Sequence, residues 1–301
     1  MHEKVVIVIG GAGGIGESVS KHFAKEDINV VIADLDLQAA RSLSNRLKSH
    51  EQESFPVHVD VTDEDSVISV VKKTVEKYGR VDYMAYCAGN NIKSPTLELT
   101  LDQWNSALAT HLTGAFLFCR EVGREMVAQG EGGRIVLLSS VAAMAPIPER
   151  GAYGASKAGL INLAGMLSLE WARYGINVNT VCPGVALTPM TQMVYERDPD
   201  LREQRLKRTP LGREVLPEEI ADLVLDLPQV QPEGRRIAQR KYQANVGIDA
   251  IFTDFSLRAD GLLRNMTEMI ASDMMGNHRF SLSLVNQSGY CLLYTSDAAD
   301  E

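Results

Sequence analysis

A tyrosine and a lysine four residues apart are the residues of this sequence best placed for proton chemistry. Tyr153 and Lys157 lie in a segment whose apolar residues recur with helical spacing, so both side chains should share one helix face. Free tyrosine titrates near ~10 and is a poor base at neutral pH, but a cation within about 4–6 Å can shift a pKa by about 1–3 units. The pair could therefore exchange a proton with a substrate, and Ser140 could offer a hydroxyl to the same substrate oxygen. An exposed helical face is the alternative interpretation of such a pair.

The elements that must position these residues alternate between short apolar runs and helical segments. Ser140 directly follows the run 134–139, which is apolar on both faces, as a strand buried in a parallel sheet should be. Strands are predicted over 5–9, 30–34, 57–60, 81–86, 134–139 and 176–181, and helices over 14–26, 38–49, 63–78 (with Thr62 as N-cap), 102–129 and 153–174. This order predicts an α/β fold, a doubly wound parallel sheet in three layers, α/β/α, with ligands at the carboxyl ends of the strands.

The first predicted strand runs into a glycine-rich turn that opens a helix. Gly10, Gly13, Gly14 and Gly16 follow the strand directly. Glycines let a backbone approach a pyrophosphate, whose charge the N–H groups of a helix N-terminus can meet. The turn therefore predicts a dinucleotide site, and a glycine-rich turn without a ligand is the alternative.

An acid at the end of the second predicted strand predicts which dinucleotide binds. Asp34 stands eighteen residues beyond Gly16, where a carboxylate would accept hydrogen bonds from the adenosine ribose and repel a 2′-phosphate. Neither the glycine turn nor Leu35, which follows Asp34, supplies a Lys or Arg. NAD(H) is therefore favoured over NADP(H). A solvated acid at a strand end is the other interpretation of Asp34.

Together, the strand-end serine, the Tyr-x-x-x-Lys helix and the spacing Gly10-x-x-x-Gly14-x-Gly16 resemble the short-chain dehydrogenase/reductase family over about residues 4–226. The resemblance implies a Rossmann fold, with Ser140, Tyr153 and Lys157 as catalytic residues. Asp60–Val61 resembles the pair that flanks the adenine, and Pro183–Gly184 resembles the loop that contacts the nicotinamide. The cofactor-binding residues that it implies are Gly10, Gly13, Gly14, Ile15, Gly16, Asp34, Leu35, Asp60, Val61, Ala88, Gly89, Tyr153, Lys157, Pro183, Gly184, Val185 and Thr188.

Three positions depart from the family's pattern. Ile9 stands where a threonine usually precedes the glycine turn, and Tyr86–Cys87 stand where the fourth strand usually ends in asparagine. His111 occupies the position of the asparagine that helps a water to relay protons. A histidine can donate, accept and titrate near neutrality, so His111 is either a substitute relay or a structural change that lowers activity.

Composition excludes several classes of partner. The net charge is −9 over 301 residues, which argues against nucleic acid or an anionic membrane surface as the main partner. No apolar run approaches the ~20 residues of a membrane span, and no signal segment precedes the first strand. The four cysteines lack paired spacing, so we expect buried thiols in a reducing cytoplasm and no metal site.

The rest of the predicted domain should select the substrate, which we expect to be a small alcohol or ketone. The segments concerned are Ala142–Gly151, Asn90–Leu97 and Met190–Arg213. The last of these carries several cations, which form either a solvated helix face or a handle for an anionic substrate: Arg197, Arg202, Arg205, Lys207 and Arg208.

The resemblance ends near residue 226. Residues 227–290 are atypical, with a displaced last strand expected near 251–261. The final residues 291–301 resemble the translation of a sequencing-library adapter, and we exclude them from the predicted fold.

The sequence therefore predicts an NAD(H)-dependent oxidoreductase acting on a secondary alcohol or ketone of polyol, sugar, steroid or hydroxyacyl type. A homodimer or homotetramer through helices 102–129 and 153–174 is expected. The alternatives are a dinucleotide-binding protein with weakened catalysis and a 3-oxoacyl reductase that uses NADPH.

Overall fold

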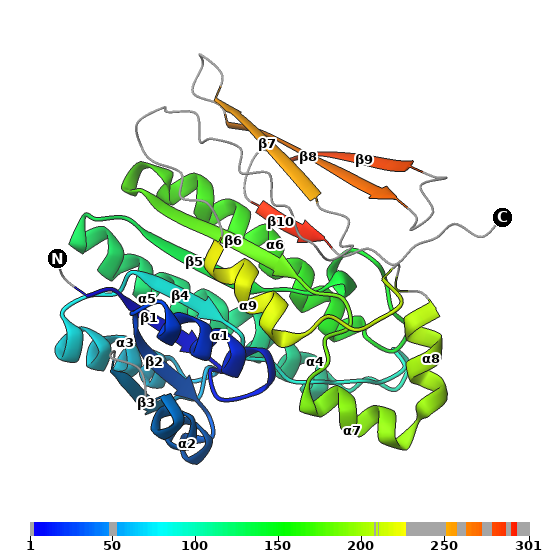
Figure 1. Cartoon of the computed structure of the whole chain (residues 1–301), viewed down its shortest axis with the longest axis horizontal. Coiled ribbons are helices and arrows are strands. Elements are labelled where there is room, and N and C mark those ends of the chain that lie inside the picture. The colour runs from blue at the N-terminus through cyan, green and yellow to red at the C-terminus, as the bar shows by residue number, and fades with distance from the viewer. Residues whose placement is uncertain are drawn as a thin grey trace.

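A parallel sheet forms the centre of the protein. The computed structural model describes residues 3–47, 53–207, 209, 211–226, 251–257, 263–272, 279–286 and 290–293. The sheet has the order β10-β6-β5-β4-β1-β2-β3, and all its neighbouring strands are parallel (Figure 1). Its strands are β1 (Val5–Ile9), β2 (Asn29–Asp34), β3 (Ser54–His58), β4 (Tyr83–Tyr86), β5 (Gly133–Leu138), β6 (Ile176–Cys182) and β10 (Tyr290–Leu293).

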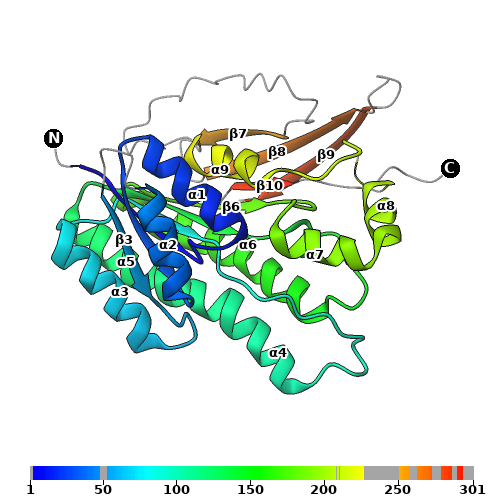
Figure 2. The same ribbon diagram turned by 60° about the horizontal axis from the view of Figure 1, so that its bottom comes forward.

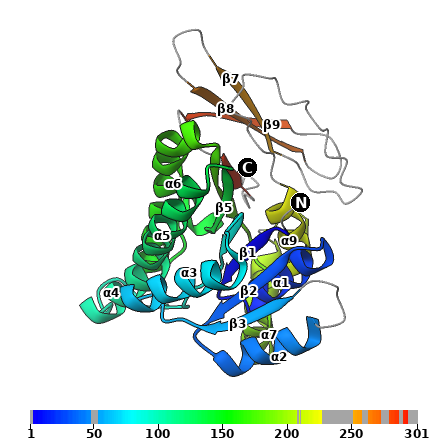
Figure 3. The same ribbon diagram turned by 90° about the vertical axis from the view of Figure 1, so that its left-hand side faces the viewer.

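Helices cover both faces of this sheet, as Figures 2 and 3 show. Side chains alternate along a strand, so Val5, Ile7 and Ile9 pack with α3, α5 and α6 in one buried cluster. Val6 and Val8 pack with α1, α2 and α9 in the other. The helices are α1 (Gly14–Lys25), α2 (Leu37–Leu47), α3 (Glu64–Tyr78), α4 (Leu101–Leu108), α5 (Gly114–Gln129), α6 (Gly151–Trp171), α7 (Pro189–Arg197), α8 (Pro199–Lys207) and α9 (Pro217–Asp226). The predicted doubly wound α/β fold is confirmed.

The helix predicted over 102–129 is interrupted. A π-helical turn over Ala109–Thr113 separates α4 from α5. Beneath this turn, the Tyr86 hydroxyl donates a hydrogen bond to the Thr110 carbonyl at 2.5 Å. A buried side chain that donates to a backbone carbonyl competes with the regular hydrogen bonds of the helix. The spacing of apolar residues in the sequence does not reveal such a contact.

Two smaller predictions are also corrected. The N-cap of α3 is Asp63, which accepts from the Asp65 N–H, while Thr62 donates to Asp60 instead. The third strand lies at Ser54–His58 rather than 57–60 and contains Pro56. β3 is the edge of the sheet, where a proline need not donate to a neighbouring strand.

The strand predicted near 251–261 forms at β7 (Ile251–Leu257), but it does not extend the parallel sheet. It pairs antiparallel with β8 (Leu263–Ser272), which pairs with β9 (Arg279–Asn286), because strands close in sequence pair readily as antiparallel neighbours. The edge beside β6 is occupied by β10, which includes residues 291–293 of the segment excluded above. Residues 258–261 and 294–301, and much of 227–290, lie outside the described residues.

Candidate functional site

The strand β5 and the helix α6 bring together the serine, tyrosine and lysine. Ser140 follows the carboxyl end of β5, and its hydroxyl accepts from the Ala142 N–H at 3.2 Å. The neighbouring Ser139 hydroxyl donates to the Lys157 carbonyl at 2.8 Å, which ties the first turns of α6 to the strand end. Tyr153 lies in the first turn of α6, and Lys157 lies one turn later.

Lys157 is buried behind the tyrosine. Its ammonium donates to the Leu138 carbonyl at 2.6 Å and lies 5.7 Å from the centroid of the Tyr153 ring. Burial lowers the pKa of Lys157 to about 8, because the charged form loses hydration. The ammonium is thus held between a strand carbonyl and the tyrosine ring.

Tyr153 differs electrostatically from the sequence-based expectation. Burial raises its pKa, and the hydrogen bond with Ser140 and the charge of Arg150 act in the opposite direction. Lys157 was expected to lower this pKa, but its ammonium is turned to Leu138 and the lowering groups are Ser140 and Arg150. Arg150 has its guanidinium carbon 5.8 Å from the Tyr153 ring centroid.

His111 lies in the π-helical turn, edge-on to Tyr153 with ring centroids 5.3 Å apart. Its Nε2 atom can donate to the Asn90 carbonyl at 3.0 Å or accept from the Asn90 N–H at 3.3 Å, according to its tautomer. Its buried Nδ1 has no hydrogen-bond partner among the described residues. Burial, and then the charge of Lys157, lowers the pKa of His111 to about 3, so the ring is neutral at physiological pH.

The glycine turn is shaped for close backbone approach. Gly10 has φ 70°, and a Cβ there would lie 2.8 Å from the Ala88 backbone, while a Cβ on Gly16 would lie 2.0 Å from the Gly10 carbonyl oxygen. Gly13 is the N-cap of α1 without a side-chain cap, which leaves N–H groups of the first turn available to an anion.

Asp34 is bound to this turn. One carboxylate oxygen accepts from the Ala12 N–H at 2.9 Å, and the other accepts from the Asp36 N–H at 3.0 Å. Each oxygen keeps a further lone pair for a ligand hydroxyl. The neighbouring Leu35 is exposed.

The other predicted contacts come from three loops at the same edge. Asp60 accepts from the Thr62 N–H and hydroxyl, and these hydrogen bonds lower the pKa of its carboxyl group. Gly89 lies against His111, where a Cβ would meet the imidazole at 2.6 Å. Thr188 caps α7 and approaches Gly14.

One cavity of about 1590 Å³ joins these parts. All the predicted site residues line it except Gly16, which supports the glycine turn from below. Arg150, Lys93 and Arg213 also line the cavity; they belong to the segments expected to select the substrate but were not predicted individually as site residues. The signals for Arg150 were its place in the segment Ala142–Gly151 and its position three residues before Tyr153.

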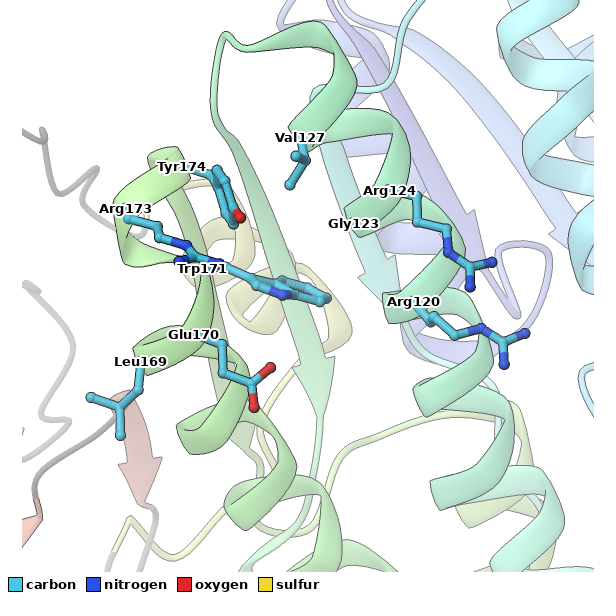
Figure 4. A pocket seen from close by; sticks show the side chains of 9 residues that line it. All are labelled: Arg120, Gly123, Arg124, Val127, Leu169, Glu170, Trp171, Arg173 and Tyr174. Carbon is cyan, nitrogen blue, oxygen red and sulfur yellow. The ribbon is translucent and has the colours of Figure 1, made fainter.

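A second hollow, of about 760 Å³, lies between α5 and α6 away from this cavity (Figure 4). Figure 4 shows Trp171 reaching from α6 toward Gly123 on α5. None of the helices in the described ranges is long and apolar enough to cross a membrane. The same residues hold no cluster of three His, Cys, Asp or Glu side chains arranged for a metal ion.

The fold and cavity define a dinucleotide-binding α/β protein, and the comparisons give its family. The family model of short chain dehydrogenase matches residues 4–199. The chain therefore belongs to the short-chain dehydrogenase/reductase family, whose members are oxidoreductases.

Similar proteins cover most of the same region. The chain is 34% identical over 219 residues to D-threitol dehydrogenase of Mycolicibacterium smegmatis, covering 72% of this chain and 83% of that protein. It is 35% identical over 224 residues to 3-oxoacyl-[acyl-carrier-protein] reductase FabG of Thermotoga maritima, covering 74% of this chain and 89% of that protein. The crystal structure of gox2181 superposes on this protein with a TM-score of 0.70 at 35% identity, covering 74% of this chain and 88% of that chain.

Proposed function

We propose that this protein is an NAD(H)-dependent oxidoreductase that interconverts a secondary alcohol and a ketone, with Tyr153 as general acid and base. The observation that carries the proposal is the meeting of Ser140, Tyr153 and Lys157 with the glycine turn and Asp34 in one cavity. Similarity to a polyol dehydrogenase supports an alcohol or ketone substrate.

The residues present fit a dinucleotide. The uncapped start of α1 and the positive φ angles of Gly10 and Gly14 provide a backbone cradle for a pyrophosphate. Asp34 supports NAD(H), because a 2′-phosphate would face its carboxylate. The cations that line the described part of the cavity, Lys93, Arg150, Lys157, Arg205 and Arg213, come from segments other than the glycine turn and the loop after β2.

The chemical roles follow from this arrangement. The bound dinucleotide supplies hydride transfer at its nicotinamide ring. Tyr153 takes the proton of the substrate hydroxyl during oxidation and returns it during reduction. Ser140 binds the same substrate oxygen, and its hydrogen bond, together with the charge of Arg150, favours the negative charge that forms on Tyr153.

The test follows NAD reduction with a panel of secondary alcohols, alongside titration with NADH and NADPH by fluorescence. We expect Tyr153→Phe to lower kcat by about 10²–10⁴-fold while NADH binding persists. We expect Asp34→Asn to weaken the preference for NADH over NADPH, since it removes the charge but keeps an acceptor for Ala12. Tight NADH binding without turnover on any alcohol or ketone contradicts the oxidoreductase proposal.

A dinucleotide-binding protein with weakened catalysis is the second candidate. The neutral, buried His111 at the relay position favours it, because a ring with a pKa of about 3 does not exchange protons readily at neutral pH. If this candidate is right, His111→Asn raises a low kcat. Unchanged turnover in that variant argues against a limiting role for His111.

The similarity to FabG keeps a 3-oxoacyl reductase using NADPH as a further alternative, which the nucleotide titration decides. We also propose a cytoplasmic location. In its support, Cys87, Cys119 and Cys182 are free thiols.

A further inference from the structure

The far end of the cavity, where substrate selection was expected, is cationic. Besides Lys157, four cationic side chains line it: Lys93, Arg150, Arg205 and Arg213. The acids that line the described part of the cavity are Glu17, Asp34 and Asp60, all from the dinucleotide end. The two ends of one cavity therefore differ in charge.

Two of these cations are neutralised by acids. Lys93 forms an ion pair with Glu149 at 2.8 Å, and Arg213 forms one with Glu219 at 2.7 Å. Such pairs leave little net charge for a ligand.

Arg150 and Arg205 form no ion pair with any acid that the structure describes. Arg150 binds the side-chain oxygen of Asn91, and Arg205 lies over the Tyr195 ring with its guanidinium carbon 5.6 Å from the centroid. Both side chains are half-buried, whereas Arg202 and Lys207 on the same helix as Arg205 are exposed and paired with Glu214 and Glu203.

Arg150 and Arg205 line the same cavity, and the charge of Arg205 acts on Arg150. Burial is the largest cause that lowers the pKa of Arg150, and the charge of Arg205 is the second. The charges of Tyr153 and Glu149 oppose them with smaller effects. Glu149 is already paired with Lys93. A bound anion stabilises two like charges that line one cavity without an acid paired to either of them.

We propose that Arg150 and Arg205 bind an oxyanion of the substrate, so that the substrate is a short secondary alcohol or ketone carrying a carboxylate or a phosphate ester. This inference rests on the proposed oxidoreductase function. Arg150 lies 5.8 Å from the Tyr153 ring centroid, so the oxyanion is expected close to the reacting end of a short substrate. The guanidinium fork matches both kinds of oxyanion.

The experiment compares charged and neutral partners of matched size in the full chain. The carboxylate arm uses 3-hydroxybutyrate against 1,3-butanediol, and the phosphate arm uses glycerol 1-phosphate against glycerol. We expect kcat/KM to be at least about 10-fold higher for the charged member of one arm, and that arm identifies the anion. Arg205→Gln should lower the advantage by about 10- to 100-fold, since it removes a charge-assisted contact. Lys207→Gln, on the same helix but paired with Glu203, is the matched control and should not change it.

The outcomes separate this inference from the proposed function. Equal or better turnover of the neutral partners in both arms keeps the oxidoreductase and overturns the anion site. If no compound is turned over, binding of acetoacetate and of inorganic phosphate to the NADH complex is followed by NADH fluorescence. Saturable binding that Arg205→Gln abolishes then supports the anion site although the proposed function fails, and no saturable binding of either anion overturns both.

Discussion

At the scale of single residues, the buried His111 of the site makes the unfolding free energy depend on pH. Its pKa of about 3 in the folded protein lies well below the ordinary value of 6.5, because burial opposes its charge. Between these values the unfolded chain binds a proton at this residue and the folded chain does not, so stability falls as the pH falls from 6.5 toward 3. The steepest contribution is about 1.4 kcal/mol per pH unit.

We therefore expect His111→Asn to flatten the pH dependence of the unfolding free energy below pH 6.5. Urea unfolding of the wild type and the variant at pH 7.0, 6.0 and 5.0 measures the difference between them. A difference between wild type and His111→Asn that stays constant over this range contradicts a buried neutral ring.

Arg150 acts on the proton chemistry of Tyr153. Its charge lowers the pKa of the tyrosine against the effect of burial, so Arg150→Gln should raise that pKa. Oxidation of an alcohol needs the deprotonated tyrosine, and the rising limb of kcat against pH should therefore move to higher pH. Arg150→Lys keeps the charge and should restore most of the shift. A change in KM without a shift of the kcat profile would mean that Arg150 binds substrate only.

At the scale of elements, the glycine turn depends on one contact beneath the cavity. A Cβ on Gly16 would lie 2.0 Å from the Gly10 carbonyl oxygen, which is backbone and cannot rotate away. We expect Gly16→Ala to abolish NADH binding and to lower the unfolding free energy by about 1–3 kcal/mol. A Cβ on Gly13 has no other atom within 4 Å, so Gly13→Ala should keep the fold to within about 1 kcal/mol. Equal melting temperatures for the two variants would contradict this packing argument.

The same elements show what the sequence can predict. The strand 5–9 was predicted at its observed bounds because a β-branched run ending at glycine has few other structures. The break between α4 and α5 was missed because it depends on Tyr86, a residue on another strand. The position of β3 was misjudged because Pro56 argues against a strand unless that strand is known to be an edge.

The site divides in the same way. The glycine turn and the Tyr-x-x-x-Lys spacing depend on residues close in the sequence, so the sequence alone indicates them. The structure brings those residues to one cavity. The hydrogen bond of Lys157 to Leu138, and the pairing of some cations but not others, depend on contacts between distant segments. Residue types alone therefore could not separate Arg205 from Arg202.

At the scale of the whole molecule, α5 and α6 present an apolar surface beside the hollow of Figure 4. Its exposed large apolar side chains are Phe116, Val127, Met166 and Leu169, with Tyr174 in the turn that follows α6. Apolar residues gathered on two adjacent helices are typical of a protein–protein interface. We therefore propose that the protein assembles as a homodimer or homotetramer through α5 and α6.

Light scattering after size-exclusion chromatography tests this assembly. Leu169 is 52% exposed on α6, and Leu169→Arg should reduce the assembly to a smaller species, because a buried interface does not tolerate an unpaired charge. Leu216, 43% exposed just before α9 on the other face of the sheet, provides the control Leu216→Arg, which should leave the mass unchanged. A wild-type mass equal to one chain would rule out the interface. An assembly that survives Leu169→Arg but not Leu216→Arg would move the interface to the face covered by α9.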